Sequence, residues 1–334
     1  MNRYRDERQA LAAAWSRRGQ QDLPTRPAVA VADFQTSLSF EPDRTETRFL
    51  LGKALVAAHR PAEAGAELTT LLSDEPSRGD INLELGRIAA QAGDVGEAVR
   101  YYHAAIDGVW QTGAAEARRQ ARIELARLLM SNGQPVRAQA ELIGLIDDLP
   151  PNAAVITDVA SLLAKAGAQP RAIGLLHHAM DLDPQNALAA QAAATLEFNG
   201  GDLLSARRDF ANAAKASPLT AANRETVDVI NRALALDPYV EHLSVSVRAG
   251  RALRALAIAK ARLERCPPMP ELADRVDRAM KRRPADLERN ADLIEETMAA
   301  AFDVERLPRG SCGVDSADDR ALAIVDAQHT TRAQ

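Results

Sequence analysis

Residues 159–184 read VASLLAKAGAQPRAIGLLHHAMDLDP, a stretch in which small, large and proline residues stand at spacings that recur along the chain. Ala172 is followed by Leu176 after four residues and by Pro184 after eight more. The same order returns with a period of 34 residues, lengthened once to 40. A fixed period of this size predicts an array of repeated structural units. The closing column consists of Pro42, Pro76, Trp110, Pro150, Pro184 and Pro218.

The other columns keep the same register, and each has a physical reason. Small residues let two helices approach closely, glycine permits the turn between them, and proline stops the second helix. The small column is Ala30, Ala64, Ala98, Ala138, Ala172 and Ala206, and the large residue four positions later is Phe34, Leu68, Tyr102, Leu142, Leu176 and Phe210. A paired column reads Leu51-Gly52, Leu85-Gly86, Leu125-Ala126, Val159-Ala160 and Ala193-Ala194, and the turn column reads His59, Gly93, Gly133, Gly167 and Gly201.

This pattern resembles the tetratricopeptide-repeat family, whose units combine a Leu-Gly pair, a turn glycine, a small alanine, a large residue and a closing proline. The resemblance implies an all-α, right-handed solenoid of helix-turn-helix repeats with a concave surface. In this family that surface usually binds extended peptides or helices. Composition agrees with stacked helices, since only 4% of the residues are aromatic and Ala and Leu dominate the apolar share.

Three segments follow from the repeat pattern. Residues 1–44 are expected to form a degenerate N-terminal capping repeat, because the second half fits while Pro24 and Pro27 interrupt it. Residues 45–218 are expected to hold five repeats, with an insertion near 113–118. Residues 219–334 lose the period but keep helical spacing, which predicts a C-terminal helical extension.

The groove residues come from the resemblance, which implies that the position two beyond the leucine of the Leu-Gly pair points into the groove. Three consecutive cations at this position predict attraction for an acidic partner. The alternative is neutralisation within each helix, because Glu84 and Glu124 precede two of the arginines by three residues. Both interpretations stay open at this stage. The predicted groove residues are Lys53, Arg87, Arg127, Ser161 and Thr195.

A second basic stretch spans residues 248–283, with eleven Lys or Arg residues against four acidic ones, a local net charge of +7. Its spacing at Arg248, Arg251 and Arg254 predicts a stripe on one helix face. One interpretation is an ordinary solvated helix, and the other is a surface for an anionic membrane or a nucleic acid. The net charge of −5 for the whole chain disfavours general affinity for nucleic acids.

Signatures of catalysis, cofactors and metals are not found in the sequence. It contains no GxGxxG, GxxxxGK[ST], HExxH or GxSxG motif. The adjacent pair His177-His178 is expected on the surface rather than in a metal site, because neighbouring helical residues point about 100° apart. Cys266 and Cys312 are too few for a disulfide scaffold, but we expect them to lie near each other and to form a bridge in an oxidising compartment.

The sequence therefore predicts a non-catalytic scaffold that binds a protein or peptide of acidic character, with no small-molecule substrate. One alternative is a membrane-tethered assembly factor of an envelope complex, and a lower one is nucleic-acid or regulator binding through residues 248–283. No apolar run is long enough to span a bilayer, so a membrane role would need an anchor that precedes Met1. The default location is the cytoplasm, with a membrane-anchored or periplasmic location as the alternative.

Overall fold

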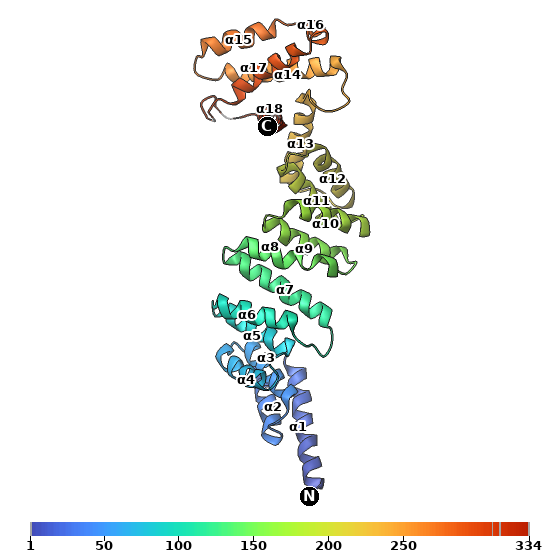
Figure 1. The fold of residues 1–334 in the computed structure, drawn as a ribbon, viewed down its shortest axis with the longest axis vertical. Coiled ribbons are helices and arrows are strands. Elements are labelled where there is room, and N and C mark those ends of the chain that lie inside the picture. The colour runs from blue at the N-terminus through green and yellow to red at the C-terminus, as the bar shows by residue number, and fades with distance from the viewer. Residues whose placement is uncertain (1, 309, 314, 333–334) are drawn as a thin grey trace. The chain divides into compact units, whose positions relative to one another are not determined.

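The computed structural model describes residues 2–308, 310–313 and 315–332, and their regular structure is helical (Figure 1). Within these residues, strand pairing is limited to two isolated bridges, Arg78 with Val109 and Gly310 with Gly313. The helices are α1 (Asn2–Asp22), α2 (Pro27–Phe40), α3 (Thr45–Ala57), α4 (Pro61–Asp74), α5 (Gly79–Gln91), α6 (Val95–Asp107), α7 (Ala114–Ser131), α8 (Pro135–Ile143), η1 (Ile146–Asp148, a short 3₁₀ helix), α9 (Ala153–Lys165), α10 (Gln169–Leu182), α11 (Ala187–Asn199), α12 (Leu203–Ala216), α13 (Ala221–Leu236), α14 (Val245–Leu263), α15 (Pro270–Met280), α16 (Pro284–Arg289), α17 (Asp292–Glu305) and α18 (Ala317–Arg332).

Two compact units make up the chain, unit 1 (Met1–Ala172) and unit 2 (Ile173–Gln334). The expected segments 1–44, 45–218 and 219–334 divide the chain at other points, and they stay a prediction. None of the described helices has the length and hydropathy needed to cross a membrane.

The turn column lies where the first helix of each pair gives way to the second. Gly93 and Gly133 have φ values of 79° and 69°, in the left-handed region that glycine enters at little cost. His59 occupies the same column with φ 59°, so this turn keeps its shape without glycine. Asp94 and Asp202 then cap α6 and α12, because their side chains accept hydrogen bonds from backbone N–H groups three residues later.

The small columns bring the two helices of a pair together. A Cβ atom at Gly52 of α3 would lie 2.7 Å from Leu68 of α4, so this close approach requires glycine. In the first pair, a Cβ atom at Gly19 of α1 would lie 2.7 Å from Phe34 of α2. Gly19 therefore makes the same kind of contact one residue later than the repeat register predicts. The alanines of the small column are all fully buried.

Trp110 stands where a proline closes the other repeats, and it packs on the start of α5. Its Nε1 donates to the carbonyl of Ala105 at 2.9 Å, and a Cβ atom at Gly79 would lie 2.4 Å from the indole. The connection is also fixed by the Val109 N–H, which donates to the carbonyl of Ser77 at 2.7 Å. The insertion that follows leads into α7, whose 18 residues make it longer than the 13-residue α5.

In unit 2, helices α14 and α17 pack together around buried Leu256, Met298 and Phe302. Helix α18 lies against α13, and ion pairs of Arg232 with Asp318 and of Arg320 with Glu225 join the two. A disulfide connects Cys266, just after α14, to Cys312, with their Cα atoms 4.0 Å apart.

Candidate functional site

Arg87 is the predicted groove residue with the most contacts, and its charge is compensated. Its Nη1 donates to Glu84 at 2.9 Å, and its Nε and Nη2 donate to Glu124 at 2.9 and 2.7 Å. Glu124 also accepts hydrogen bonds from Gln120 and Tyr102. The hydrogen bonds to Glu124 raise the pKa of Arg87, although burial opposes them. Arg87 therefore has little capacity left for a partner.

The other four predicted groove residues differ in their burial and in their contacts. Lys53 is half-buried, with its Nζ 5.8 Å from the centre of the Phe49 ring. Arg127 is exposed and forms no ion pair with any residue that the structure describes, because Glu124 binds Arg87 rather than Arg127. Ser161 and Thr195 donate to the backbone carbonyls four residues earlier, at 2.8 and 2.7 Å.

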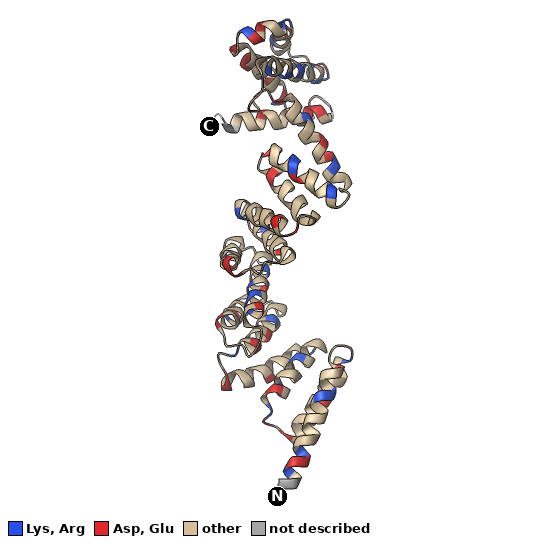
Figure 2. Cartoon of the chain, turned by 90° about the vertical axis from the view of Figure 1, so that its right-hand side faces the viewer, with Lys and Arg blue, Asp and Glu red and all other residues tan. Residues whose placement is uncertain are grey.

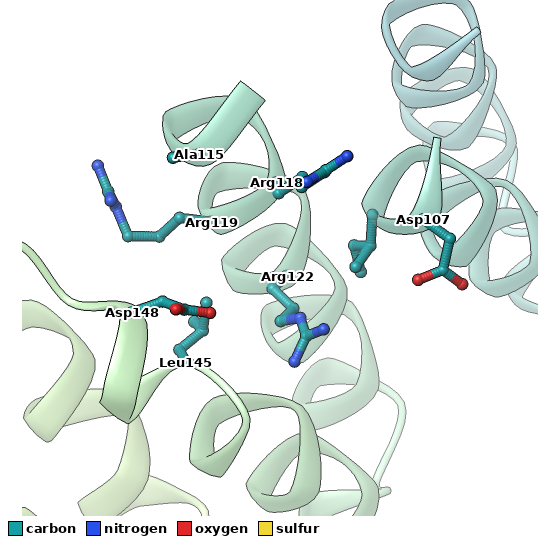
Figure 3. Close-up of a pocket in the computed structure, with 8 residues that line it drawn as sticks. Asp107, Ala115, Arg118, Arg119, Arg122, Leu145 and Asp148 are labelled. Atoms are coloured by element: carbon teal, nitrogen blue, oxygen red, sulfur yellow. The ribbon is translucent and has the colours of Figure 1, made fainter. Parts of the chain in front are cut away.

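A cavity of about 540 Å³ opens in unit 1 between the end of α6, the start of α7 and the turn after α8. Figure 3 shows its three arginines on α7, with Asp107 of α6 on one side and Asp148 of η1 on the other. The insertion near residues 113–118 lengthens the start of α7 and carries Arg118, and Arg119 and Arg122 follow directly after it. The cavity is lined by Ile106, Asp107, Ala115, Arg118, Arg119, Arg122, Leu145 and Asp148.

The three arginines of this cavity, which we call the arginine pocket, differ in their partners. Arg119 pairs with Glu116, and only 11% of its side chain is exposed. Arg118 donates to the carbonyl of Gly108 at 3.0 Å. Arg122 forms no ion pair within the described chain, although it is half-buried. The N-terminal end of α7 adds a partial positive charge. The repeat pattern does not predict this pocket, although three arginines within five residues beside the insertion are a signal that the sequence offers.

Most basic side chains of the stretch 248–283 form hydrogen bonds or ion pairs within unit 2. Arg251 donates to the carbonyls of Leu234 and Asp237 at 2.6 and 2.9 Å, which caps the end of α13. Arg248 donates to the carbonyl of Pro238, whereas Arg254 is exposed. Figure 2 shows acidic residues interspersed with basic ones along the helices. The ion pairs of this stretch are Lys260–Asp277, Arg262–Glu305, Arg262–Asp315, Arg265–Asp319, Arg275–Asp303, Arg282–Glu296 and Arg283–Asp286.

A second cavity, of about 630 Å³, lies in unit 2 beside the buried pair Arg262 and Glu305. The Arg262 Nη1 donates to Glu305 at 3.1 Å, whereas Glu305 Oε1 and Arg262 Nε have no hydrogen-bond partner. Burial raises the pKa of Glu305 to about 7, although the nearby Arg262 opposes this.

His177 is partly exposed, with 37% of its side chain accessible, but it contacts more than the sequence led us to expect of a surface histidine. Its Nε2 lies 2.8 Å from Asp209 Oδ2 and 3.0 Å from Glu197 Oε1, and both carboxylates are buried. The three residues come from α10, α12 and α11, so a pattern within one helix could not bring them together. His178, by contrast, is exposed as expected.

No protein-family model matches the sequence, and no curated protein matches it significantly. Solved structures do resemble it. The C-terminal part of a TPR repeat-containing protein from Cytophaga hutchinsonii is 14% identical, with a TM-score of 0.51 over 65% of this chain and 87% of that chain. PilF from Pseudomonas aeruginosa is 17% identical, with a TM-score of 0.47 over 66% of this chain and 97% of that one. A tetratricopeptide repeat protein from Parabacteroides merdae is 13% identical, with a TM-score of 0.45 over 88% and 99% of the two chains.

Proposed function

We propose, on the premise that the chain has an all-α tetratricopeptide-repeat fold, that the protein is a non-catalytic scaffold that binds an acidic segment of a protein partner. The observation that carries the proposal is the arginine pocket. All three arginines line one cavity, and Asp107 and Asp148 share it with them. Neither of these carboxylates pairs with an arginine of the pocket among the described residues.

Arginine is suited to hold a carboxylate of a partner. Its planar guanidinium can donate two parallel hydrogen bonds to one carboxylate, and these charge-assisted bonds are stronger than neutral ones. Arg119 already pairs with Glu116, so the charges available to a carboxylate of the partner are those of Arg118 and Arg122, which form no ion pair among the described residues. Apolar Ile106 and Leu145 provide a surface against which an aliphatic part of the partner can pack.

Of the predicted groove residues, four can contribute to binding the acidic segment and one cannot. Lys53 and Arg127 remain available for an acidic segment, and Ser161 and Thr195 offer hydroxyl oxygens as acceptors. Arg87 is left out, because its N–H groups already bind two carboxylates.

A second candidate function is an assembly factor of an envelope complex, as the alternative from the sequence suggested. The disulfide between Cys266 and Cys312 favours it, because disulfides persist mainly in oxidising compartments such as the periplasm. Labelling of free thiols in protein taken directly from cells tests this point. Two reactive thiols would remove the support for this candidate, whereas a protected pair would keep it.

Binding of a fluorescein-labelled oligoglutamate peptide, measured by fluorescence anisotropy, tests the main proposal. We expect the Arg118→Glu/Arg122→Glu variant to bind more than about tenfold more weakly than the parent and to depend less on salt. Arg137→Glu is the matched control, because Arg137 of α8 lies outside the pocket and contacts only neutral Gln134.

Two outcomes would contradict the proposal. If the pocket variant binds like the parent whereas Lys53→Glu/Arg127→Glu loses binding, the groove residues form the site. If none of the variants differs from the parent, the acidic partner is wrong. Far-UV circular dichroism of each variant shows whether its helices remain folded.

A further inference from the structure

His177, Glu197 and Asp209 form a cluster of three metal-ligand side chains in unit 2. One potential ligand atom from each of the three side chains lies within 4.8 Å of the other two. The residues lie on three successive helices, α10, α11 and α12, so any ion held among them would join all three. This cluster is separate from the arginine pocket and does not depend on the proposed function.

The spacing of the ligand atoms suits a small divalent ion. Two ligand atoms that bind a metal at about 2.1 Å from neighbouring octahedral positions lie about 3.0 Å apart. Here His177 Nε2 lies 3.0 Å from Glu197 Oε1 and 2.8 Å from Asp209 Oδ2. An ion could therefore replace the shared imidazole proton with small movements of the side chains.

Glu197 supplies an independent observation that points to a ligand at this cluster. The residue is only 4% exposed, and its Oε2 is buried without a hydrogen-bond partner. A buried carboxylate oxygen without a partner is costly in free energy. A cation bound through Oε1, which faces the cluster, would neutralise the carboxylate and so lessen the cost of burying Oε2 without a partner.

The charges around the cluster also leave room for a cation. Two buried carboxylates face one imidazole, and Asp202 adds a further negative field. The compensating group is Arg208, which donates to Asp209 Oδ1 at 2.8 Å and lies 3.8 Å from Glu197. Because 58% of the Arg208 side chain is exposed, it can move into solvent when an ion binds. The imidazole is also partly exposed, at 37%, which leaves a side open to water ligands.

We propose that His177, Glu197 and Asp209 bind a divalent first-row transition-metal ion, of the class of Zn²⁺, Co²⁺ or Mn²⁺. One imidazole nitrogen with two carboxylates favours these ions over Ca²⁺ and Mg²⁺, which prefer oxygen ligands alone. Three protein ligands leave the remaining positions to water. The ion would fasten α10, α11 and α12 to one another.

Titration of the full-length protein with Co²⁺, followed by its visible absorption bands and by equilibrium dialysis, tests the proposal. We expect one ion per chain. His177→Ala, Glu197→Gln and Asp209→Asn should each weaken binding by at least about tenfold. His178→Ala is the matched control, because His178 is the exposed neighbour of His177, and its binding should equal that of the parent.

Arg208→Ala gives the sharpest result, because it removes the cation that competes with the metal. Metal binding should become tighter in this variant, whereas a purely structural ion-pair network would give no such gain. The proposal is overturned if the parent binds no Co²⁺ or Zn²⁺, if the three ligand variants bind as tightly as the parent, or if Arg208→Ala binds more weakly. Glu197→Gln and His177→Ala decide the question even if Asp209→Asn fails to fold, which circular dichroism would show.

Discussion

Arg87 in unit 1 and His177 in unit 2 each stand between two carboxylates, but the two networks are compensated to different degrees. Arg87 offers three N–H groups to Glu84 and Glu124, and Glu124 receives two further donors. His177 shares a single Nε2 between Glu197 and Asp209. Exposed Arg208 donates to Asp209, but Glu197 Oε2 is buried without a hydrogen-bond partner. Where donors match acceptors, the charges hold the fold together. Where acceptors are in excess, they remain available for a ligand.

Among single substitutions at a fixed pH, the largest effect is expected from Arg87→Met, which breaks the compensated network. It would leave the carboxylates of buried Glu84 and half-buried Glu124 without their cation. Loss of one member of a fully buried pair costs about 3 to 5 kcal/mol, and the 33% exposure of Arg87 reduces this to about 2 kcal/mol. Urea unfolding followed by tryptophan fluorescence measures it selectively, because Trp15 and Trp110 both belong to unit 1.

Arg60→Met is the control for this prediction. Arg60 forms an ion pair with Glu63 on the surface, so water screens the charge and the unfolding midpoint should hardly change. If the unfolding midpoint shifted equally in Arg87→Met and Arg60→Met, burial of the ion pair would not be the cause of the larger expected loss.

A separate, pH-dependent effect is expected through Glu305 in unit 2. Its pKa in the folded state is about 7, above its ordinary value of 4.5, so between these values the folded state holds a proton that the unfolded state has lost. The stability from this group is complete below pH 4.5 and is lost as the pH rises to 7, by up to about 1.4 kcal/mol per pH unit.

Glu305→Gln tests this dependence by urea unfolding between about pH 5 and 7, followed by far-UV circular dichroism. Burial also raises the pKa of Glu197 to about 7, so Glu197 contributes to the same pH dependence. In the Glu305→Gln variant, the free energy of unfolding should therefore fall with pH about half as steeply as in the parent. Tryptophan fluorescence, which reports on unit 1, should not show the change. A slope that is the same in the variant and the parent would contradict the assignment to Glu305.

The smallest effect is expected from Arg208→Met. Like Arg87, Arg208 contacts two carboxylates, but more than half of its side chain is exposed and His177 also contacts both of them. The free energy of unfolding should therefore fall by less than about 1 kcal/mol. Far-UV circular dichroism during urea unfolding measures this change. A loss of stability as large as that of Arg87→Met would contradict the idea that the greater exposure of Arg208 makes its ion pairs weaker.

The all-α repeat fold could be predicted from the sequence because its signals are local. Turn glycines, capping Asp94 and the small residues act within one helix pair, so their spacing is visible in the sequence. The place of Trp110 also follows from the repeat pattern, since it occupies the position of the closing proline and packs at the end of its repeat. The short helix α16 gave no comparable signal, because its six residues are too few to show a period.

The polar sites could not be predicted in the same way, because their residues come from different helices. Glu124 lies three residues before Arg127, yet it binds Arg87, which is 37 residues away. One regularity does emerge from the structure. Side chains 32 residues apart meet between Arg78 and Glu46, His177 and Asp209, and Asn223 and Gln191. This distance is two residues short of the period, so polar pairs at this separation are a signal that a search within single helices misses.

Helix α18 limits how far the array can grow. In a stack of helix pairs, each pair offers its next neighbour an apolar face, and an uncovered last face would invite another pair or a second molecule. Here α18 lies along α13, with buried Leu322 and Val325 in the core and ion pairs at Arg232 and Arg320. A further helix pair added after α13 would compete with α18 for the same surface. Helix α18 thus covers the face of α13 that a further helix pair would otherwise use.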